Sequence, residues 1–250
     1  MVYVDTTPET DRVYTMSDAS PVILSTSEPA VVARLDNGRA NVIDDAAVGA
    51  LTNAVDVAEE AELPLVVLGR DGIFSAGFDL KVFEQGPEAT AALVLAGARL
   101  LLRLVEARIP VVIGATGHSV AMGALLLLAA DYRMGADGRF KIGLNEVAAG
   151  MVLPSFATTL AEDRLSKRHI LRATTMAEMY QPADARDAGY LDEVVAPDEL
   201  EEATLGRAEA LAGFSSAVYG ATKAKVRGGL ATRLQAAIEA DQAAFDRGSS

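Results

Sequence analysis

Residues 109–131, I-P-V-V-I-G-A-T-G-H-S-V-A-M-G-A-L-L-L-L-A-A-D, decide the fold of this chain. The β-branched run at 111–113 predicts a buried strand, the glycines after it mark turns, and the apolar run at 121–130 predicts a buried helix. A helix that begins directly after a glycine turn leaves backbone N–H groups without partners at its start. Such a start favours a bound anion or an oxyanion that forms during a reaction. Alone, the stretch also fits a buried strand–helix unit of any α/β protein.

A second stretch repeats this order of strand, glycine turn and helix start. The unbroken apolar run at 65–69 predicts a strand buried on both faces of a parallel sheet. It leads into R-D-G-I-F-S-A-G-F-D-L at 70–80, where a helix begins near Asp79. The glycine turns at 76–77 and 122–123 can each point a backbone N–H at one common spot. Two such donors on one carbonyl oxygen form an oxyanion hole.

The remaining chain alternates between predicted strands and helices, which indicates an α/β fold. We expect further strands at 22–24, 31–35, 132–134, 140–142 and 191–195. We expect helices at 44–62, 88–107, 154–164, 166–173 and 182–188, and from 199 onward with breaks at 213–216 and 228–229. Asp44 is the expected N-cap of the first of these helices. Residues 1–18 lack periodicity and are predicted to be a loosely attached lead-in.

Composition restricts the chemistry that this chain can carry. Its 250 residues are half hydrophobic, with no cysteine, two histidines and a formal net charge of −13. Disulfides, thiolate nucleophiles and cysteine-based zinc sites are excluded, and a metal site rich in histidine or a Ser-His-Asp triad is hard to build. The negative charge opposes nucleic-acid and membrane binding. Residues 1–20 lack the blocks of a signal peptide, and Pro110 and His118 argue against a membrane span at 109–130, so we predict a cytoplasmic protein.

Glu146 is the best candidate for an acid or base in such a chain. It follows the apolar run at 142–144 and precedes V-A-A-G at 147–150, so its segment is expected to be largely buried. Apolar surroundings disfavour an ionised carboxylate and raise its pKa toward the range that is useful for moving protons. Local context leaves a second interpretation open, in which Glu146 is a buried glutamate satisfied by backbone donors.

Four stretches occur in an order that is typical of one family. Residues 74–80 match F-x-A-G-x-D-L, and residues 110–124 match K-P-V-I-A-A-V-N-G-x-A-x-G-G-G. Residues 131–134 with Phe140 and 145–147 match C-D-x-R-I-A…F…P-E-V, and 183–195 match A-x-E-A-x-x-x-G-L-V-D-x-V-V. From about Val22 onward, the chain therefore resembles the crotonase (enoyl-CoA hydratase/isomerase) superfamily.

The resemblance implies an α/β, crotonase-like fold of repeated ββα turns, with a lead-in at 1–20, a core at 21–198 and a C-terminal helical trimerisation region at 199–250. It implies an acyl-CoA thioester as substrate, coenzyme A being part of that substrate rather than a cofactor, no metal, and homotrimers or dimers of trimers. Matched by motif, the oxyanion donors are Ala76 and Met122, and the side chain of Met122 is expected to narrow the pocket. The expected substrate contacts are Arg39, Ala40, Val42, Gly77, Phe78, Asp79, Leu80, Lys81, Val120, Gly123, Leu125 and Asn145.

The departure that matters most is Leu125, which stands where the hydratases of this family place a first glutamate. Adding water to a double bond normally takes two carboxylates, whereas moving a double bond takes one base that removes a proton and returns it elsewhere. Leu125 with Glu146 therefore favours a 3-enoyl-CoA to 2-enoyl-CoA isomerase. Two alternatives stay open: an enoyl-CoA hydratase or another crotonase reaction of fatty-acid β-oxidation, and an acyl-CoA-binding protein without turnover.

Other polar residues have simpler interpretations. His118 is predicted to be a hydrogen-bonded turn residue, His169 a surface residue, and Asp79 a helix cap. An acidic protein needs basic side chains where the CoA phosphates bind. Each candidate basic residue could equally belong to a solvated basic surface. The candidates are Lys81, Lys223, Lys225 and Arg227, and the acyl pocket is expected to use Phe83, Met122, Leu125, Met151 and Phe156.

Overall fold

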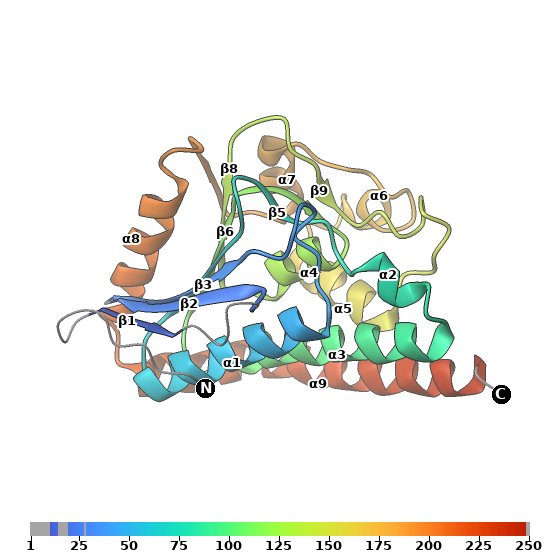
Figure 1. Cartoon of the computed structure of the whole chain (residues 1–250), viewed down its shortest axis with the longest axis horizontal. Coiled ribbons are helices and arrows are strands. Elements are labelled where there is room, and N and C mark those ends of the chain that lie inside the picture. Colours follow the sequence, from blue (N-terminus) through green and yellow to red (C-terminus); the bar gives the residue numbers. More distant parts are fainter. Residues whose placement is uncertain (1–10, 15–19, 28, 249–250) are drawn as a thin grey trace.

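Two sheets form the centre of the computed structural model, which describes residues 11–14, 20–27 and 29–248 (Figure 1). The larger sheet has the strand order β1-β2-β3-β4-β6-β8-β10, and the smaller has the order β5-β7-β9. The strands are β1 (Asp11–Tyr14), β2 (Val22–Ser27), β3 (Ala30–Leu35), β4 (Leu65–Leu68), β5 (Gly72–Ser75), β6 (Val111–Ala115), β7 (Gly117–Val120), β8 (Tyr132–Ala136), β9 (Ile142–Gly143) and β10 (Glu193–Val195).

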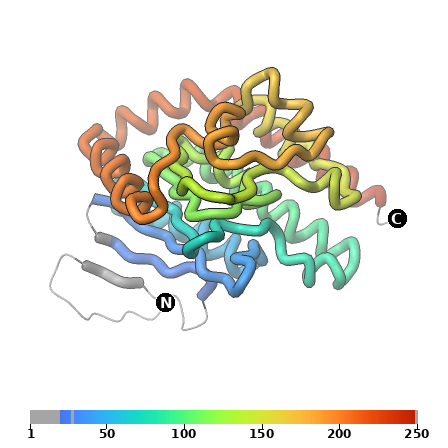
Figure 2. The backbone as a smooth tube through the Cα atoms, turned by 90° about the horizontal axis from the view of Figure 1, so that it is seen from above, coloured from blue at the N-terminus to red at the C-terminus, as the bar shows by residue number. Residues whose placement is uncertain are grey.

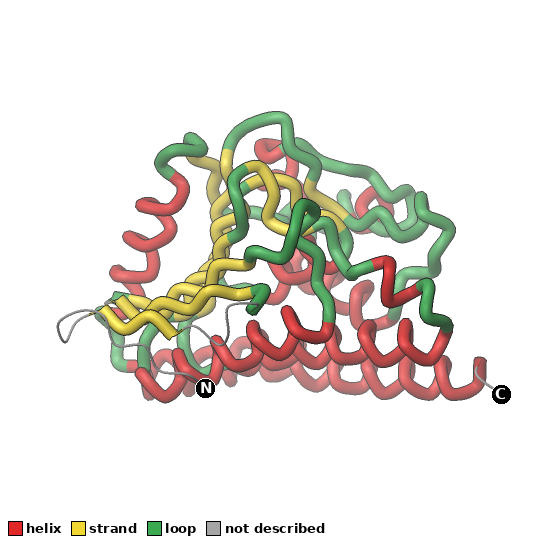
Figure 3. The backbone as a smooth tube through the Cα atoms, in the orientation of Figure 1, coloured by secondary structure: helices red, strands yellow, loops and turns green. Residues whose placement is uncertain are grey.

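Helices cover both faces of the larger sheet. They are α1 (Asp45–Ala61), α2 (Leu80–Phe83), α3 (Pro87–Glu106), α4 (Met122–Ala129), α5 (Ser155–Arg164), α6 (Ile170–Ala173), α7 (Pro182–Ala188), α8 (Leu200–Ala212) and α9 (Ser216–Gly248). Helix α8 packs on one face, while α1, α3 and α9 lie side by side as a layer beyond the other (Figures 1 and 3). This double cover explains why every residue of β4 and β6 is buried, as their apolar runs predict.

The α/β fold is confirmed, and so is the N-cap at Asp44, which accepts a hydrogen bond from the Ala47 N–H at 2.8 Å. From β3 to β10 the larger sheet is parallel, whereas β1, β2 and β3 pair antiparallel. Strand β1 lies within the segment that we expected to be a loose lead-in, and that expectation is wrong for Asp11–Tyr14; residues 1–10 and 15–19 lie outside the described residues. No helix in the described ranges is long and apolar enough to cross a membrane.

The smaller sheet is a feature that the sequence analysis missed. Its strands β5 and β7 fall where glycines indicated only turns. They pair in parallel with Gly72 opposite Gly117, and a Cβ atom on Gly117 would overlap the Gly72 backbone. These glycines therefore permit a close approach of two backbones, a role that sequence spacing does not distinguish from a turn.

The last helix is longer than expected, because α9 continues through Gly228 and Gly229 without the predicted break. Each glycine costs an exposed helix about 1 kcal/mol relative to alanine. Packing along α3 and α5 outweighs this cost, since α9 buries residues on both sides of the glycine pair, among them Arg227 before it and Leu230 after it. Seen from above, α9 lies across the molecule from the N-terminal strands, with α4 between them (Figure 2).

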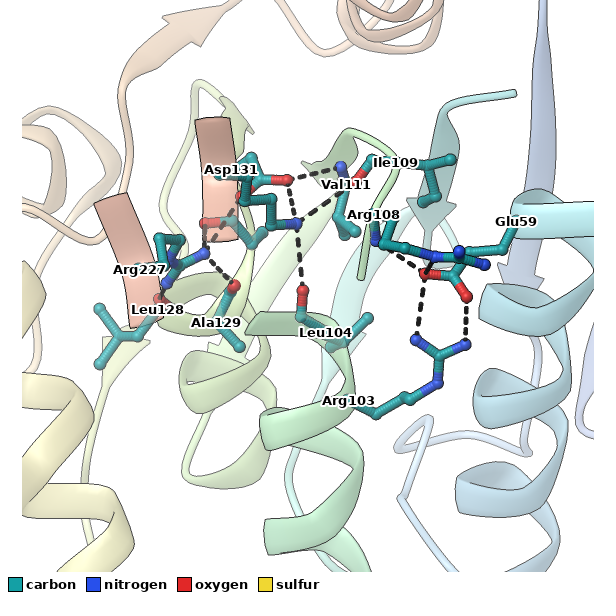
Figure 4. A network of polar contacts seen from close by, with 12 residues as sticks. Glu59, Arg103, Leu104, Arg108, Ile109, Val111, Leu128, Ala129, Asp131 and Arg227 are labelled. Atoms are coloured by element: carbon teal, nitrogen blue, oxygen red, sulfur yellow. Dashed lines mark hydrogen bonds and ion pairs between the residues drawn. The ribbon is translucent and has the colours of Figure 1, made fainter. Parts of the chain in front are cut away.

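A buried cluster of charges fastens α9 to the core (Figure 4). Asp131, directly before β8, accepts from Lys223 Nζ at 2.6 Å, from Arg227 Nη1 at 3.2 Å and from the Val111 N–H at 2.9 Å. Lys223 and Arg227 also donate to main-chain carbonyls, including Ala129 O at 2.7 Å. Both basic side chains are almost completely buried, so the suggestion that they hold CoA phosphates is wrong.

Candidate active site

A cavity of about 360 Å³ opens between the two glycine turns, α3, α5 and the end of α9. Its walls are mostly apolar, which suits the chain of an acyl group. The lining residues are Ala76, Phe78, Leu80, Phe83, Thr90, Val94, Ala121, Leu125, Asn145, Glu146, Ala149, Met151, Val152, Pro154, Phe156 and Phe245. Four of the five predicted acyl-pocket residues are among them, and Met122 is the exception.

The two glycine turns meet beside this cavity, as the sequence predicts. Gly77 adopts a φ of +100°, and a Cβ atom there would lie 2.9 Å from Ala121 Cβ and 3.4 Å from the Met122 nitrogen. A Cβ on Gly123 would lie 2.5 Å from the Ser75 carbonyl oxygen. Only glycine allows the turn after β5 and the start of α4 to approach so closely.

The structure corrects one of the two expected oxyanion donors. The Ala76 N–H donates to the Ala40 carbonyl oxygen at 3.0 Å, so it is already used within the fold. The Ile43 N–H donates to Gly77 O at 2.8 Å, and the Asp79 N–H donates to Ile43 O at 3.0 Å. Phe78 lies between these two bonds, and in parallel pairing such a residue directs its own N–H away from the partner strand. No acceptor for the Phe78 N–H is found in the described part of the chain, which leaves it free for the cavity.

Met122 keeps its predicted place as the second donor. It is the first residue of α4, where backbone N–H groups have no intrahelical acceptor. Its side chain does not narrow the pocket, contrary to expectation, because it is fully buried and turns toward Gly97 of α3, where a Cβ atom would lie 3.3 Å from Met122 Cε. Met122 can therefore replace the usual glycine without filling the cavity.

Ala121, the N-cap of α4, has a φ of +52° and a ψ of −120°, a conformation that favours glycine. We expect Ala121→Gly to raise the free energy of unfolding by about 1 kcal/mol, because relief of strain exceeds the entropy cost of glycine. This corresponds to a melting temperature higher by about 2–4 °C. The control is Ala124→Gly in the same helix, which relieves no positive φ and should lower the melting temperature. A lower value for Ala121→Gly as well would contradict the strain assigned to Ala121.

Glu146 follows β9 and lines the cavity, as predicted. Burial raises the pKa of its carboxyl group, although the N–H groups of Glu146 itself and of Asn145 lower it in part. Its Oε2 atom is buried and has no hydrogen-bond partner among the described residues. The alternative of a buried glutamate satisfied by backbone donors therefore does not account for this oxygen. Leu125 lines the same cavity and is 2% exposed, so no second carboxylate stands at that position.

The other predicted contacts fall into three groups. Phe78, Leu80 and Asn145 line the cavity, and Gly77, Val120 and Gly123 shape the two turns that border it. Arg39, Ala40, Val42, Asp79 and Lys81 do not line it. Asp79 caps α2 by accepting from the Lys81 N–H at 3.0 Å, as expected.

The two histidines lie outside the cavity lining. His118 accepts a hydrogen bond from the Lys141 N–H at 2.9 Å through Nδ1, as predicted, but it lies in strand β7 and not in a turn. The prediction that His169 is a surface residue is wrong. It is buried, and its Nδ1 lies 3.3 Å from the Tyr180 hydroxyl.

Two residues of α9 belong to the site but were not predicted. Phe245 lines the cavity, and Asp241 accepts from the N–H groups of Ser155 and Phe156, both at 3.0 Å. Asp241 thereby caps α5, whose first residues form part of the cavity wall. The sequence predicts that Asp241 and Phe245 lie on a helix, but no local pattern predicts that this end of α9 packs against α5.

Comparisons with known proteins agree with this geometry. The family described as "Enoyl-CoA hydratase/isomerase" matches residues 26–249. The mitochondrial enoyl-CoA delta isomerase 1 of Homo sapiens is 32% identical over 174 residues, which are 69% of this chain and 58% of the human protein. The enzyme of the same name from Rattus norvegicus is 35% identical over 133 residues, 52% of this chain and 46% of the rat protein. The chain thus spans about half the length of these curated relatives.

Solved structures match over more of the chain. An enoyl-CoA hydratase/isomerase family protein from Pseudomonas syringae has a TM-score of 0.87 and 40% identity, covering 89% of this chain and 96% of that one. A protein from Mycobacterium tuberculosis is named an enoyl-CoA isomerase in one structure and a probable enoyl-CoA hydratase in another, and a protein from Mycobacterium marinum is named an enoyl-CoA hydratase. These three structures are 32% identical to this chain, with TM-scores of 0.85 to 0.87, and cover 90–92% of this chain and 98–99% of theirs.

Proposed function

The chain belongs to the enoyl-CoA hydratase/isomerase (crotonase) family, and from this membership we propose that it converts 3-enoyl-CoA thioesters into 2-enoyl-CoA thioesters. One observation carries the choice of reaction: the cavity presents Glu146 as a carboxylate, and an apolar Leu125 where a second carboxylate would have to stand. One base is sufficient to move a double bond, whereas hydration also requires a water molecule to be activated.

In this proposal Glu146 removes a proton from C2 of the 3-enoyl chain and returns it to C4. Between these steps the thioester is a dienolate whose charge lies on the carbonyl oxygen. The free N–H groups of Phe78 and Met122 bind that oxygen, and losing one such donor typically costs about 3 kcal/mol of transition-state stabilisation. The raised pKa of Glu146 suits a group that must take up and release the same proton.

The proposal includes a cytoplasmic homotrimer, or dimer of trimers, that acts on acyl-CoA. Large apolar side chains near the start of α9 are exposed in the single chain, which supports an interface there: Phe214, Val218 and Val226 are 62%, 66% and 77% exposed. A mass measurement in solution tests this part, and a monomer at micromolar concentration would contradict it.

The reaction is tested by supplying purified protein with a 3-enoyl-CoA and, separately, with a 2-enoyl-CoA. We expect the absorbance of a conjugated thioester to appear from the first substrate and no hydration of the second. Hydration of the 2-enoyl-CoA would establish the alternative reaction, which the name of the similar M. marinum protein favours. Binding of both thioesters without any conversion would indicate a protein that binds acyl-CoA without turnover.

The pH dependence of kcat/KM gives a second prediction. Glu146 acts as a base only when ionised, so activity is expected to fall as the pH drops through the pKa of Glu146. Because burial raises that pKa, the acidic limb should lie above the ordinary range for glutamate. Rates measured from about pH 4 to about pH 9 check this expectation. An acidic limb at the ordinary glutamate pKa would contradict the desolvation of Glu146 in the working enzyme.

A further inference from the structure

Gly97, in the middle of α3, is a buried glycine that the proposed reaction does not use. Glycine weakens the interior of a helix relative to alanine, so a glycine at this place calls for a physical reason. A Cβ atom on Gly97 would lie 2.5 Å from Phe78 Cζ, 2.6 Å from Phe78 Cε1 and 3.3 Å from Met122 Cε. The Met122 thioether is flexible and can give way, whereas an aromatic ring is rigid. Alanine therefore fits here only if the Phe78 ring moves.

Gly97 lies on the face of α3 that borders the cavity. Residues three or four apart share one face of a helix, so Thr90, Val94 and Gly97 form a row along α3. Thr90 and Val94 line the cavity, whereas Gly97 is covered by the ring of Phe78, which is itself a lining residue. How closely this ring approaches α3 therefore determines how much of the cavity is open beside it.

A long acyl chain in this cavity has to pass the Phe78 ring. In the proposed reaction the thioester lies at the glycine turns, where the Phe78 N–H is free. Thr90 and Phe245 line the cavity from the first turns of α3 and the last turns of α9. These two helices pack against each other in opposite directions, so these turns lie at the same end of the molecule (Figure 1). A short acyl chain ends near the ring, while a long one continues toward Thr90 and Phe245.

The surroundings of Phe78 restrict the direction in which its ring can move. Gly77 O and the Asp79 N–H are hydrogen-bonded to the main chain of Ile43 at 2.8 and 3.0 Å, which fixes the chain on both sides of Phe78. The ring of Phe83 occupies another side, with its centroid 6.3 Å from that of Phe78. The cavity is the open side. A methyl group at position 97 is therefore expected to turn the ring into the cavity while the Phe78 N–H stays in place.

We propose that Gly97 is a specificity-determining residue, which admits thioesters with long acyl chains because it leaves room for the Phe78 ring against α3. The inference rests on the proposed function, because it takes this cavity as the acyl site. It concerns the length of the substrate and not the proton transfer at Glu146. One added methyl group should thus weaken the binding of long acyl chains more than that of short ones.

The test compares Gly97→Ala with Gly49→Ala in α1, where a Cβ atom would meet no described atom within 4 Å outside its own helix. Both variants remove one helix glycine, so Gly49→Ala should raise the melting temperature by about 1–4 °C and leave selectivity unchanged. Calorimetry gives the affinities of hexanoyl-CoA and dodecanoyl-CoA, which are saturated and bind without isomerising. Gly97→Ala should weaken dodecanoyl-CoA binding by about 10–200-fold relative to hexanoyl-CoA binding.

A second variant identifies the ring as the cause. Gly97→Ala combined with Phe78→Leu shortens the displaced side chain and keeps the main-chain donor at Phe78. It should restore the relative affinity for dodecanoyl-CoA, because the smaller side chain and the new methyl group fit together. A general loss of packing would not be repaired by removing more atoms.

The outcomes separate this inference from the proposed reaction. An unchanged ratio of the two affinities in folded Gly97→Ala would overturn the inference and leave the reaction intact. A wild type that excludes dodecanoyl-CoA would overturn it too, and so would a ratio that Phe78→Leu does not restore. A change of selectivity confined to Gly97→Ala, in a protein that does not isomerise 3-enoyl-CoA, would support the inference and refute the reaction. Failure of the wild type to bind either thioester would refute both.

Discussion

Glu146→Gln is expected to lower kcat for 3-enoyl-CoA isomerisation by about a thousandfold, with little change in KM. Glutamine keeps the shape of the side chain but cannot accept the substrate proton, and a positioned general base contributes about 10²–10⁴-fold to a rate. The oxyanion donors at Phe78 and Met122 belong to the backbone and stay in place. Substrate affinity should therefore remain while the chemical step is lost. Steady-state rates from the absorbance of the conjugated product measure this effect.

The control for Glu146→Gln is the stability of the variant. Because the pKa of Glu146 is raised in the folded state, folded protein holds more protons than unfolded protein between the ordinary and the raised pKa. Stability from this group is present at low pH and is lost as the pH rises through that window. Glu146→Gln should consequently melt at a higher temperature than the wild type at neutral pH. Retained activity would refute Glu146 as the base, and a lower melting temperature would refute the burial cost assigned to it.

Asp131→Asn is expected to lower the free energy of unfolding by about 3–5 kcal/mol. The substitution keeps the volume of the side chain but leaves Lys223 and Arg227 buried beside a neutral partner. Burial already lowers the pKa of Lys223 although Asp131 opposes this, so desolvation of the ammonium group is only partly compensated. Removing the negative charge leaves that desolvation unopposed. Urea unfolding at a fixed protein concentration measures the change.

A matched control exists on the same helix, where Arg233 of α9 pairs with Asp163 of α5 at 2.7 Å. This pair is much more exposed than the Asp131 cluster, and exposed ion pairs contribute about 0–1 kcal/mol. Asp163→Asn should therefore change the free energy of unfolding by less than about 1 kcal/mol. Similar losses for the two variants would show that burial does not distinguish these clusters.

The sequence predicted those parts of the fold that local patterns determine. The apolar runs that became β4 and β6, the cap at Asp44 and the two glycine turns were all readable. The smaller sheet and the unbroken α9 were not, because both depend on partners distant in the chain. In the sequence, Gly72 and Gly117 indicate turns, but the structure pairs them opposite each other in two strands. Gly228 and Gly229 indicate a helix break, but α9 continues through them because it packs against other helices.

The site was predictable to a similar degree. Residue chemistry pointed to Glu146, and Leu125 indicated which reaction to expect. The motif suggested Ala76 as a donor, but which N–H is free depends on the pairing of residues 77–79 with Ile43, and no local pattern specifies that pairing. Phe245 and Asp241 reach the site from the last helix of the chain, and only tertiary packing places them there.

The charge cluster at Asp131 also has a consequence for the order in which the chain is synthesised and folded. Asp131 precedes Lys223 by 92 residues and Arg227 by 96, and ribosomes release a chain from its N-terminus at about 5–20 residues per second. Strands β1 to β8 therefore emerge several seconds before the cations that neutralise this carboxylate. During that interval Asp131, which binds the Val111 N–H at the start of β6, lacks the two cations with which it pairs in the folded chain. Asp131 therefore gains both of its cationic partners only when the last helix docks on the core.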